Sequence, residues 1–355
     1  MATISLCMIV RDEAPVLGRC LASICKAVDE IILVDTGSLD RTREIAADFT
    51  DKIYDFPWVD DFAAARNFAF SKAQGDYQMW LDADDVVPPE SADALLHLKE
   101  HLTADVVMMP YQVAFDPAGN PTLTYYRERL LRRACGFRWE GAVHEAITPA
   151  GEILYAEIPI EHRKLHVNDP DRNLRIFGQL LANGTSLSAR ERFYYSRELY
   201  YHERYADAAQ SFRLFLDSDG WVEDKIQACL LLSKCEQHLG NADAARLALC
   251  RSFLMDVPRA EICCEIGRLC MEQACWEQAV FWYTAAIHAP FPADGFQDGD
   301  CHDYIPYLQL CVCYDRLGNL PKAQAYNDKA GRIRPGDASV LANRAYFRNQ
   351  DRRNV

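Results

Sequence analysis

The sequence lacks the features that would place the chain in a membrane or on a nucleic acid. No stretch approaches the roughly 20 apolar residues that a transmembrane helix needs, so we expect no membrane span. Basic residues are in the minority, at 38 Lys and Arg against 52 Asp and Glu. The net charge of −14 repels nucleic-acid backbones and anionic membrane surfaces, so we expect no nucleic-acid partner. The N-terminus lacks a basic segment and a cleavage-like site, and we expect no signal peptide.

The 14 cysteines do not form a metal-binding pattern. No Cys-x-x-Cys pair occurs, so their spacing gives no support for a zinc site. Ten of them lie between Cys229 and Cys313, mostly at positions typical of helix interiors. We interpret them as small buried apolar residues of a protein from a reducing compartment. Together with the expected lack of a membrane span, this predicts a cytoplasmic protein.

Short apolar runs alternate with amphipathic stretches in the first third of the chain. Strands are predicted at residues 4–10, 30–34, 52–55 and 77–81, and helices at residues 14–25, 40–49 and 62–74. This alternation is typical of a Rossmann-like, mostly parallel sheet. Ligands of such sheets bind beyond the carboxyl ends of the strands, where acidic turns begin at Asp35 and Asp82. Residues 103–161 show a pattern of short strands and turns.

The C-terminal half is repetitive and has little strand signal. Small alanines recur 37, 34 and 44 residues apart, at Ala208, Ala245, Ala279 and Ala323. A tetratricopeptide repeat has a period of about 34 residues and a small residue where two helices approach closely. We therefore predict an α/β domain over residues 1–170, a connecting helix over 171–187, and an all-α domain of tetratricopeptide-like hairpins over 188–355. Such repeats could also join two copies of the chain as a homo-oligomer.

Three carboxylates, of Asp82, Asp84 and Asp85, follow the apolar strand at residues 77–81. At pH 7 they would repel one another unless a cation lies among them. Carboxylate oxygens are hard ligands that suit Mg²⁺ or Mn²⁺. The sequence therefore predicts a metal–diphosphate site at the end of this strand.

Five motifs together resemble the family 2 glycosyltransferases of the GT-A fold. They are SLCMIVRDE at residues 5–13, VDTGSLDRT at 34–42, DDFAAARN at 60–67, LDADD at 81–85 and WEGAVHE at 139–145. The sequence is most similar to the branch in which this domain is followed by tetratricopeptide-like helices. Some members of that branch glycosylate peptides or proteins.

The resemblance implies a nucleotide-sugar site. It places Asp35 on the nucleotide base, usually uracil, and Arg66 near the nucleotide, where it could balance diphosphate charge. Trp139 could stack on a sugar face, although a role as a core aromatic explains it equally well. The expected nucleotide-sugar-binding residues are Val10, Arg11, Glu13, Asp35, Gly37, Arg66, Asp82, Ala83 and Trp139.

The same resemblance implies a metal site that holds Mn²⁺ or Mg²⁺. Asp82 is expected toward ribose or metal, and Asp84 directly on the metal. GT-A enzymes often add a histidine near the end of the domain. His162 fits the end of the strand at residues 158–160 best, and His166 is the alternative.

Glu145 is the candidate general base. Family 2 enzymes invert the anomeric centre, so the acceptor loses a proton as it attacks opposite the leaving diphosphate. The match places Glu145 at the acceptor side. The chain lacks the Glu-Asp pair that many members have at the base position, so Asp85 and His144 remain alternatives.

These expectations favour an inverting transferase that moves a sugar from a nucleotide diphosphate donor, with UDP expected, to an acceptor. Tetratricopeptide grooves commonly hold peptides, which favours a peptide or protein acceptor. The alternative is a catalytically inactive sugar-nucleotide-binding protein that acts through its repeats as an interaction module. Nucleotidyl transfer would need a Gly-rich basic loop after the first strand, and residues 11–14 do not form one.

Overall fold

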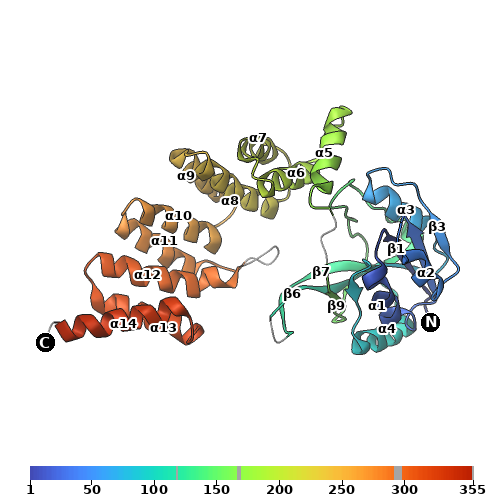
Figure 1. Cartoon of the computed structure of the whole chain (residues 1–355), viewed down its shortest axis with the longest axis horizontal. Helices are drawn as coiled ribbons and strands as arrows, with labels where there is room; N and C mark the ends of the chain where they lie inside the picture. Colours follow the sequence, from blue (N-terminus) through green and yellow to red (C-terminus); the bar gives the residue numbers. More distant parts are fainter. Residues whose placement is uncertain (117–118, 166–168, 292–297, 354–355) are drawn as a thin grey trace. The chain divides into compact units, whose positions relative to one another are not determined.

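The computed structural model describes residues 1–116, 119–165, 169–291 and 298–353 (Figure 1). They form two compact units, Met1–Thr185 and Ser186–Val355. Helix α5 (Arg172–Ala182), which covers most of the expected connecting helix, belongs to the first unit. Within the described ranges, no helix combines the length and the apolar character that a membrane crossing requires.

A nine-stranded mixed sheet forms the centre of the first unit. Its order is β3–β2–β1–β4–β7–β6–β9–β5, and β8 pairs with β6. The strands are β1 (Ile4–Val10), β2 (Glu30–Asp35), β3 (Ile53–Asp55), β4 (Tyr77–Trp80), β5 (Asp85–Val86), β6 (Val106–Phe115), β7 (Pro121–Arg132), β8 (Ile153–Tyr155) and β9 (Ile160–His162). The first four strands of this order pair in parallel, as the α/β pattern predicts. Antiparallel pairing begins where β7 joins β4.

The prediction of short strands over residues 103–161 was wrong for β6 and β7. These strands have 10 and 12 residues and pair with each other antiparallel. Three register shifts interrupt their ladder, so no regular alternation of apolar and polar residues runs along them. Buried charged residues in β7, Glu128 and Arg129, also hide the strand from a hydrophobicity pattern.

Helices cover both faces of the parallel part of the sheet. Successive residues of β1 pack on opposite sides, because side chains alternate along a strand. Leu6 and Met8 share a core with α1 (Ala14–Ile24) and α4 (Pro89–His101), whereas Cys7 packs with α3 (Phe62–Lys72). The short α2 (Thr42–Ala47) follows β2, and a 3-10 turn, η1 (Arg133–Cys135), follows β7.

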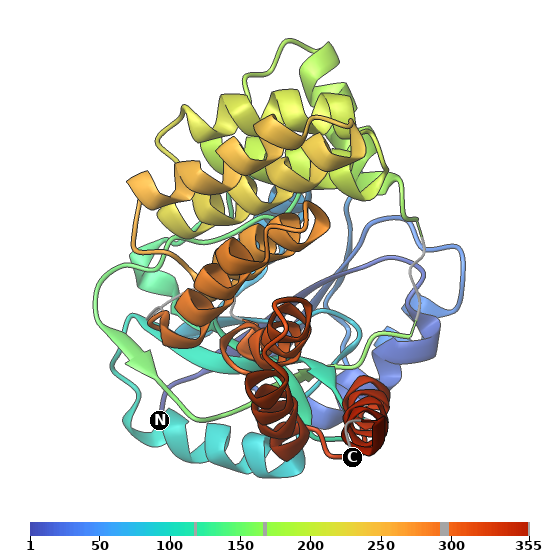
Figure 2. The same ribbon diagram turned by 90° about the vertical axis from the view of Figure 1, so that its left-hand side faces the viewer.

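The second unit is a tetratricopeptide-like array of helical hairpins, whose axes turn progressively along the chain (Figure 2). Its helices are α6 (Ala189–Tyr201), α7 (Tyr205–Leu216), α8 (Val222–His238), α9 (Ala242–Arg251), α10 (Ala260–Glu272), α11 (Trp276–His288), α12 (Tyr304–Arg316), α13 (Leu320–Ile333) and α14 (Ala338–Arg353). Two 3-10 turns, η2 (Ser252–Leu254) and η3 (Gly299–His302), lie between them.

The four recurring alanines occupy the same place in successive hairpins. Ala208, Ala245, Ala279 and Ala323 lie near the start of α7, α9, α11 and α13, and each is fully buried. Gly267 of α10 allows a similarly close approach, since a Cβ placed there would lie 2.9 Å from the ring of Tyr283 in α11. Small residues therefore set the spacing of the hairpins, as the repeat pattern predicts.

Candidate active site

A cavity of about 710 Å³ lies in the first unit, where β1, β2 and β4 end. It is lined by residues that follow these strands, by the loop that contains Glu145, and by the segment after β9. Ten of the predicted site residues line it: Val10, Arg11, Glu13, Arg66, Asp82, Ala83, Asp84, His144, Glu145 and His162. Four do not: Asp35, Gly37, Asp85 and Trp139.

The acidic loop at residues 82–85 has a fixed backbone. Asp85 N donates to the carbonyl oxygen of Asp82 at 3.0 Å, and Asp82 N donates to Asp85 Oδ2 at 3.0 Å. β5 and β9 pair antiparallel, with Asp85 directly opposite His162. This pairing brings together two side chains that lie 77 residues apart in the sequence.

Asp84, Asp85 and His162 form a group of metal-binding type. Each offers one ligand atom, and these atoms all lie within 4.8 Å of one another. His166, the alternative histidine, lies outside the described residues. Asp82 also lines the cavity beside Asp84 and His162, and carboxylate oxygens suit Mg²⁺ or Mn²⁺, so the residues present fit the predicted cofactor.

The acids around this group repel one another. Burial raises the pKa of Asp84, and the charges of Asp82 and Asp85 raise it further. Burial also raises the pKa of Glu13 to about 7, together with the charges of Asp84 and Asp82. Burial opposes a charge on His162, but its contact with Asp85 and the nearby acids raise its pKa overall. The cluster therefore favours the uptake of positive charge.

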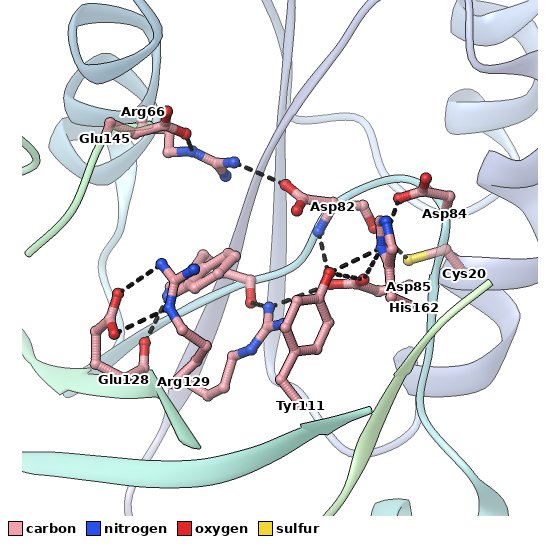
Figure 3. Close-up of polar contacts among 12 residues, drawn as sticks. Cys20, Arg66, Asp82, Asp84, Asp85, Tyr111, Glu128, Arg129, Glu145 and His162 are labelled. Atoms are coloured by element: carbon pink, nitrogen blue, oxygen red, sulfur yellow. Dashed lines mark hydrogen bonds and ion pairs between the residues drawn. The ribbon is translucent and has the colours of Figure 1, made fainter. Parts of the chain in front are cut away.

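Arg66 is buried and joins the acidic loop to the candidate base (Figure 3). Its Nη2 donates to Asp82 Oδ1 at 2.7 Å, and its Nε donates to Glu145 Oε1 at 2.6 Å. Burial alone would raise the pKa of Asp82, but Arg66 lowers it to about 2. Because two protein carboxylates already balance Arg66, its charge is less available to a diphosphate than the sequence comparison implied.

A tight loop presents Glu145 to the cavity. Glu140 and Ala146 close the loop with two backbone hydrogen bonds of 2.9 and 3.0 Å. Gly141 and His144 have positive φ angles of 94° and 54°, which allow the chain to turn within so few residues. Glu145 Oε1 is held by Arg66, and the described residues place no hydrogen-bond partner on Oε2. His144 is exposed at the turn.

The predicted residues that do not line the cavity have structural partners. Asp35 is buried and accepts hydrogen bonds from Ser38 N at 3.0 Å and from Arg43 Nη1 at 3.0 Å. Burial would raise its pKa, but these hydrogen bonds lower it. Gly37, with a φ of 104°, provides the turn after β2.

The expectation that Trp139 stacks on a sugar is not supported by its position, because the residue is only 3% exposed and the centre of its ring lies 5.1 Å from that of Trp80. Asp85 is fully buried, which separates this alternative base from any acceptor in the cavity. The sequence reasoning missed several residues near the site. Tyr111 and Arg129 contact Asp85, and Lys164 and Arg172 line the cavity. Arg129 lies within a strand, where the sequence contains no signal of its partner.

The fold and site define a class of protein: a GT-A domain with an acidic loop after β4, joined to tetratricopeptide-like helices. The sequence comparison agrees, since residues 5–150 match the family model for glycosyl transferase family 2. The first unit is therefore a family 2 glycosyltransferase domain.

Two curated relatives and one solved structure are similar to the chain. A TPR repeat-containing protein of Synechococcus elongatus is 40% identical over 164 residues, 45% of this chain and 39% of the relative. The SPbeta prophage-derived glycosyltransferase SunS of Bacillus subtilis is 24% identical over 251 residues, 65% of this chain and 58% of the relative. The chain thus spans less than two thirds of either relative. Glucosyl-3-phosphoglycerate synthase of Mycobacterium tuberculosis, crystallised with Mn²⁺ and UDP-glucose, is 16% identical over 53% of this chain and 81% of that chain, with a TM-score of 0.36. That score does not establish a shared fold.

Proposed function

We propose that the chain is an inverting glycosyltransferase that moves a sugar from a nucleotide diphosphate, with UDP expected, to a nucleophilic acceptor. One observation carries the proposal: Asp82, Asp84, His162 and Glu145 line a single cavity at the carboxyl ends of the parallel strands. This is where α/β sheets bind their ligands.

Asp84 and His162 would hold Mn²⁺ or Mg²⁺, with Asp82 beside them. The cation would supply positive charge to the departing diphosphate. Arg66 keeps Asp82 ionised and oriented, since it donates to Oδ1 and leaves Oδ2 for other partners. Asp85 is not included among the ligands, because its side chain is buried behind the loop.

Glu145 is the proposed base. A carboxylate within hydrogen-bond reach can take the proton of an attacking hydroxyl or thiol. Arg66 fixes one carboxylate oxygen, Oε1, so the other oxygen of Glu145 is available to an acceptor. His144, one residue earlier in the same loop, is the alternative.

Arg172 is the proposed contact to the diphosphate, in place of Arg66. Its guanidinium packs over the ring of Phe62 at 4.6 Å, and its side chain lines the same cavity as Asp82 and Asp84. Lys164 lines the same cavity and could assist. Cationic side chains favour a dianionic ligand, and a guanidinium can contact two phosphate oxygens at once.

The first experiment is a donor screen that measures UDP release from several UDP-sugars. We expect release that stops with EDTA and returns with added Mn²⁺ or Mg²⁺. Asp84→Ala should bind the metal more weakly and release little UDP. A matched control, Asp93→Ala on α4, changes an acid that does not line the cavity and should behave as wild type.

Full UDP release in chelator would contradict the metal role. Binding of UDP-sugar without release, across all donors and candidate acceptors, would instead favour the alternative of an inactive sugar-nucleotide-binding protein.

A further inference from the structure

Asp85 lies near the cavity without lining it, and its carboxylate has four hydrogen-bonding partners (Figure 3). Its Oδ2 accepts hydrogen bonds from Asp82 N at 3.0 Å and from Arg129 Nη1 at 3.1 Å. Its Oδ1 lies 2.8 Å from the Tyr111 hydroxyl and 3.1 Å from His162 Nδ1. The side chains of Asp85 and Arg129 are both fully buried.

These four contacts leave Asp85 little capacity for a metal ion. An ionised carboxylate has about four lone-pair positions, two on each oxygen. Each oxygen of Asp85 already has two partners, and one partner is the guanidinium of Arg129, which balances the negative charge. Proximity groups Asp85 with Asp84 and His162, but its bonding distinguishes it from them.

The same contacts constrain the proton on His162. Its Nδ1 lies 3.1 Å from Asp85 Oδ1, 2.8 Å from the Tyr111 hydroxyl oxygen and 3.4 Å from Asp84 Oδ1. The phenol has a single proton, and the carboxylate is the stronger acceptor for it. If Tyr111 donates to Asp85, then Nδ1 must also carry a proton to make its contacts with these three oxygens favourable. The other ring nitrogen, Nε2, then keeps its lone pair.

We infer that Asp85 is a positioning residue that holds the Nδ1 proton of His162 and so leaves Nε2 as the ligand atom. This inference rests on the proposed metal role of His162. In metal sites generally, a ligating histidine donates its other N–H to a carboxylate or carbonyl, which fixes both the tautomer and the ring orientation. The direct cross-strand pairing of Asp85 with His162 in β5 and β9 provides that arrangement here.

Arg129 and Tyr111 make the arrangement rigid. The Arg129 guanidinium is sandwiched by aromatic rings, 3.8 Å from the centre of Trp80 and 4.2 Å from that of Tyr111. Its Nη1 also donates to the carbonyl oxygen of Trp80 at 3.1 Å. Asp85 therefore cannot turn toward the cavity without leaving the buried Arg129 cation unpaired, which is strongly unfavourable.

The first test reads the tautomer of His162 directly, in the metal-free protein and without any sugar nucleotide. ¹⁵N-histidine labelling and long-range ¹⁵N–¹H NMR distinguish Nδ1–H from Nε2–H, and the signal that is missing in His162→Gln identifies the residue. At a pH where the ring is neutral, we expect the proton on Nδ1. A predominant Nε2–H tautomer would overturn the inference, whatever the enzyme's activity.

The second test compares Mn²⁺ affinity among folded variants by calorimetry and electron paramagnetic resonance. Loss of such an outer partner typically weakens metal binding about 10–100-fold, and we expect this for Asp85→Asn. Tyr111→Phe, which keeps the Asp85–Arg129 pair, should weaken binding in the same direction and provides the test if Asp85→Asn does not fold. Glu128→Gln is the matched control. Glu128 is a buried acid next to Arg129 on β7, and it pairs with Arg127 and not with Asp85 or His162.

The outcomes separate this inference from the proposed function. Wild-type affinity in both Asp85→Asn and Tyr111→Phe would overturn the positioning role. An equal loss in Glu128→Gln would also overturn it, since a general loosening of β7 would then explain the effect. If wild-type protein binds no Mn²⁺ at all, the metal part of the proposed function fails, and the tautomer experiment still decides whether Asp85 orients His162.

Discussion

Arg66 shows how one side chain can serve two carboxylates with different tasks. It contacts Asp82, at the end of β4, and Glu145, in the loop closed by Glu140 and Ala146. Its guanidinium also lies 5.1 and 4.8 Å from the ring centres of Trp80 and Trp139, which shield it from water. A change at either carboxylate would therefore be felt at the other through the shared cation.

Replacing Glu145 by glutamine tests the proposed base. Glutamine keeps the size and one acceptor oxygen for Arg66 but cannot take a proton. We expect donor binding to persist and sugar transfer to fall by about 10²–10⁴-fold, the usual contribution of general-base catalysis. Transfer rates and UDP-sugar affinity should be measured on the same preparation.

The comparison variant is His144→Asn, because asparagine tolerates the positive φ of 54° at this position. A large loss of transfer in His144→Asn, with Glu145→Gln within about threefold of wild type, well short of that range, would transfer the role of base to His144.

The sequence predicted several residues that follow strands and line the cavity, but not those that pack behind them. Asp82 and Asp84 were predictable because acids at the end of an apolar strand signal a ligand. Asp85 belongs to the same acidic run, but its burial depends on Tyr111 and Arg129, which lie on β6 and β7. Contacts between distant strands leave no local pattern, so the difference between Asp84 and Asp85 could not be read from the sequence.

At the scale of elements, the close contact of α10 with α11 depends on a glycine, Gly267, which has no side chain. Gly267→Ala would place a methyl group 2.9–3.1 Å from three ring carbons of Tyr283. Helix propensity favours alanine by about 0.5–1 kcal/mol, whereas overpacking a core typically costs about 1–3 kcal/mol. We expect a net loss of roughly 1 kcal/mol in the stability of the second unit, measured by urea unfolding.

Gly178→Ala in α5 is the control for this prediction. A Cβ at Gly178 meets no atom within 4 Å, so only the propensity term remains. We expect a gain of about 0.5–1 kcal/mol in the first unit. A stabilised Gly267→Ala protein would mean that Tyr283 moves aside at little cost, and that this glycine does not set the spacing of the hairpin.

Helices and strands whose apolar residues recur with a regular period were predictable from the sequence. Those that mix apolar and charged residues irregularly were not. β1, α1 and β2 lie where the apolar pattern places them, and the alanines of the repeats mark α7, α9, α11 and α13. By contrast, β7 contains Arg127, Glu128 and Arg129 in succession, and its tertiary pairing places Glu128 and Arg129 in a strand that is buried only over residues 128–131.

At the scale of the whole molecule, the helical unit has a groove of its own, separate from the cavity of the first unit. A groove of about 570 Å³ is lined by Tyr200, Lys234, Gln237, His238, Glu265 and Arg268, from α6, α8 and α10. If these helices bind a peptide acceptor, Lys234→Glu should raise the apparent KM for that acceptor while UDP-sugar hydrolysis stays unchanged. We expect hydrolysis to be unchanged because the proposed donor site lies in the cavity of the first unit.

Arg332→Glu on α13 is the matched control, since it makes the same change of charge at an exposed position that does not line the groove. Circular dichroism should confirm that both variants keep their helices. An unchanged KM for the true acceptor in Lys234→Glu would remove the groove from acceptor recognition and leave the helical unit as a scaffold or an oligomer surface.

The pairing of β5 with β9 also bears on how the protein is made. On the ribosome, Asp85 emerges 77 residues before the histidine that it faces. Until β9 arrives, the nascent acidic loop has no partner strand, and closing so long a loop costs chain entropy. A cation that binds only the closed arrangement would stabilise it by mass action. The ion proposed for catalysis would then also stabilise the folded state of newly synthesised chains. A cell short of that ion would contain more incompletely folded chains as well as fewer active ones.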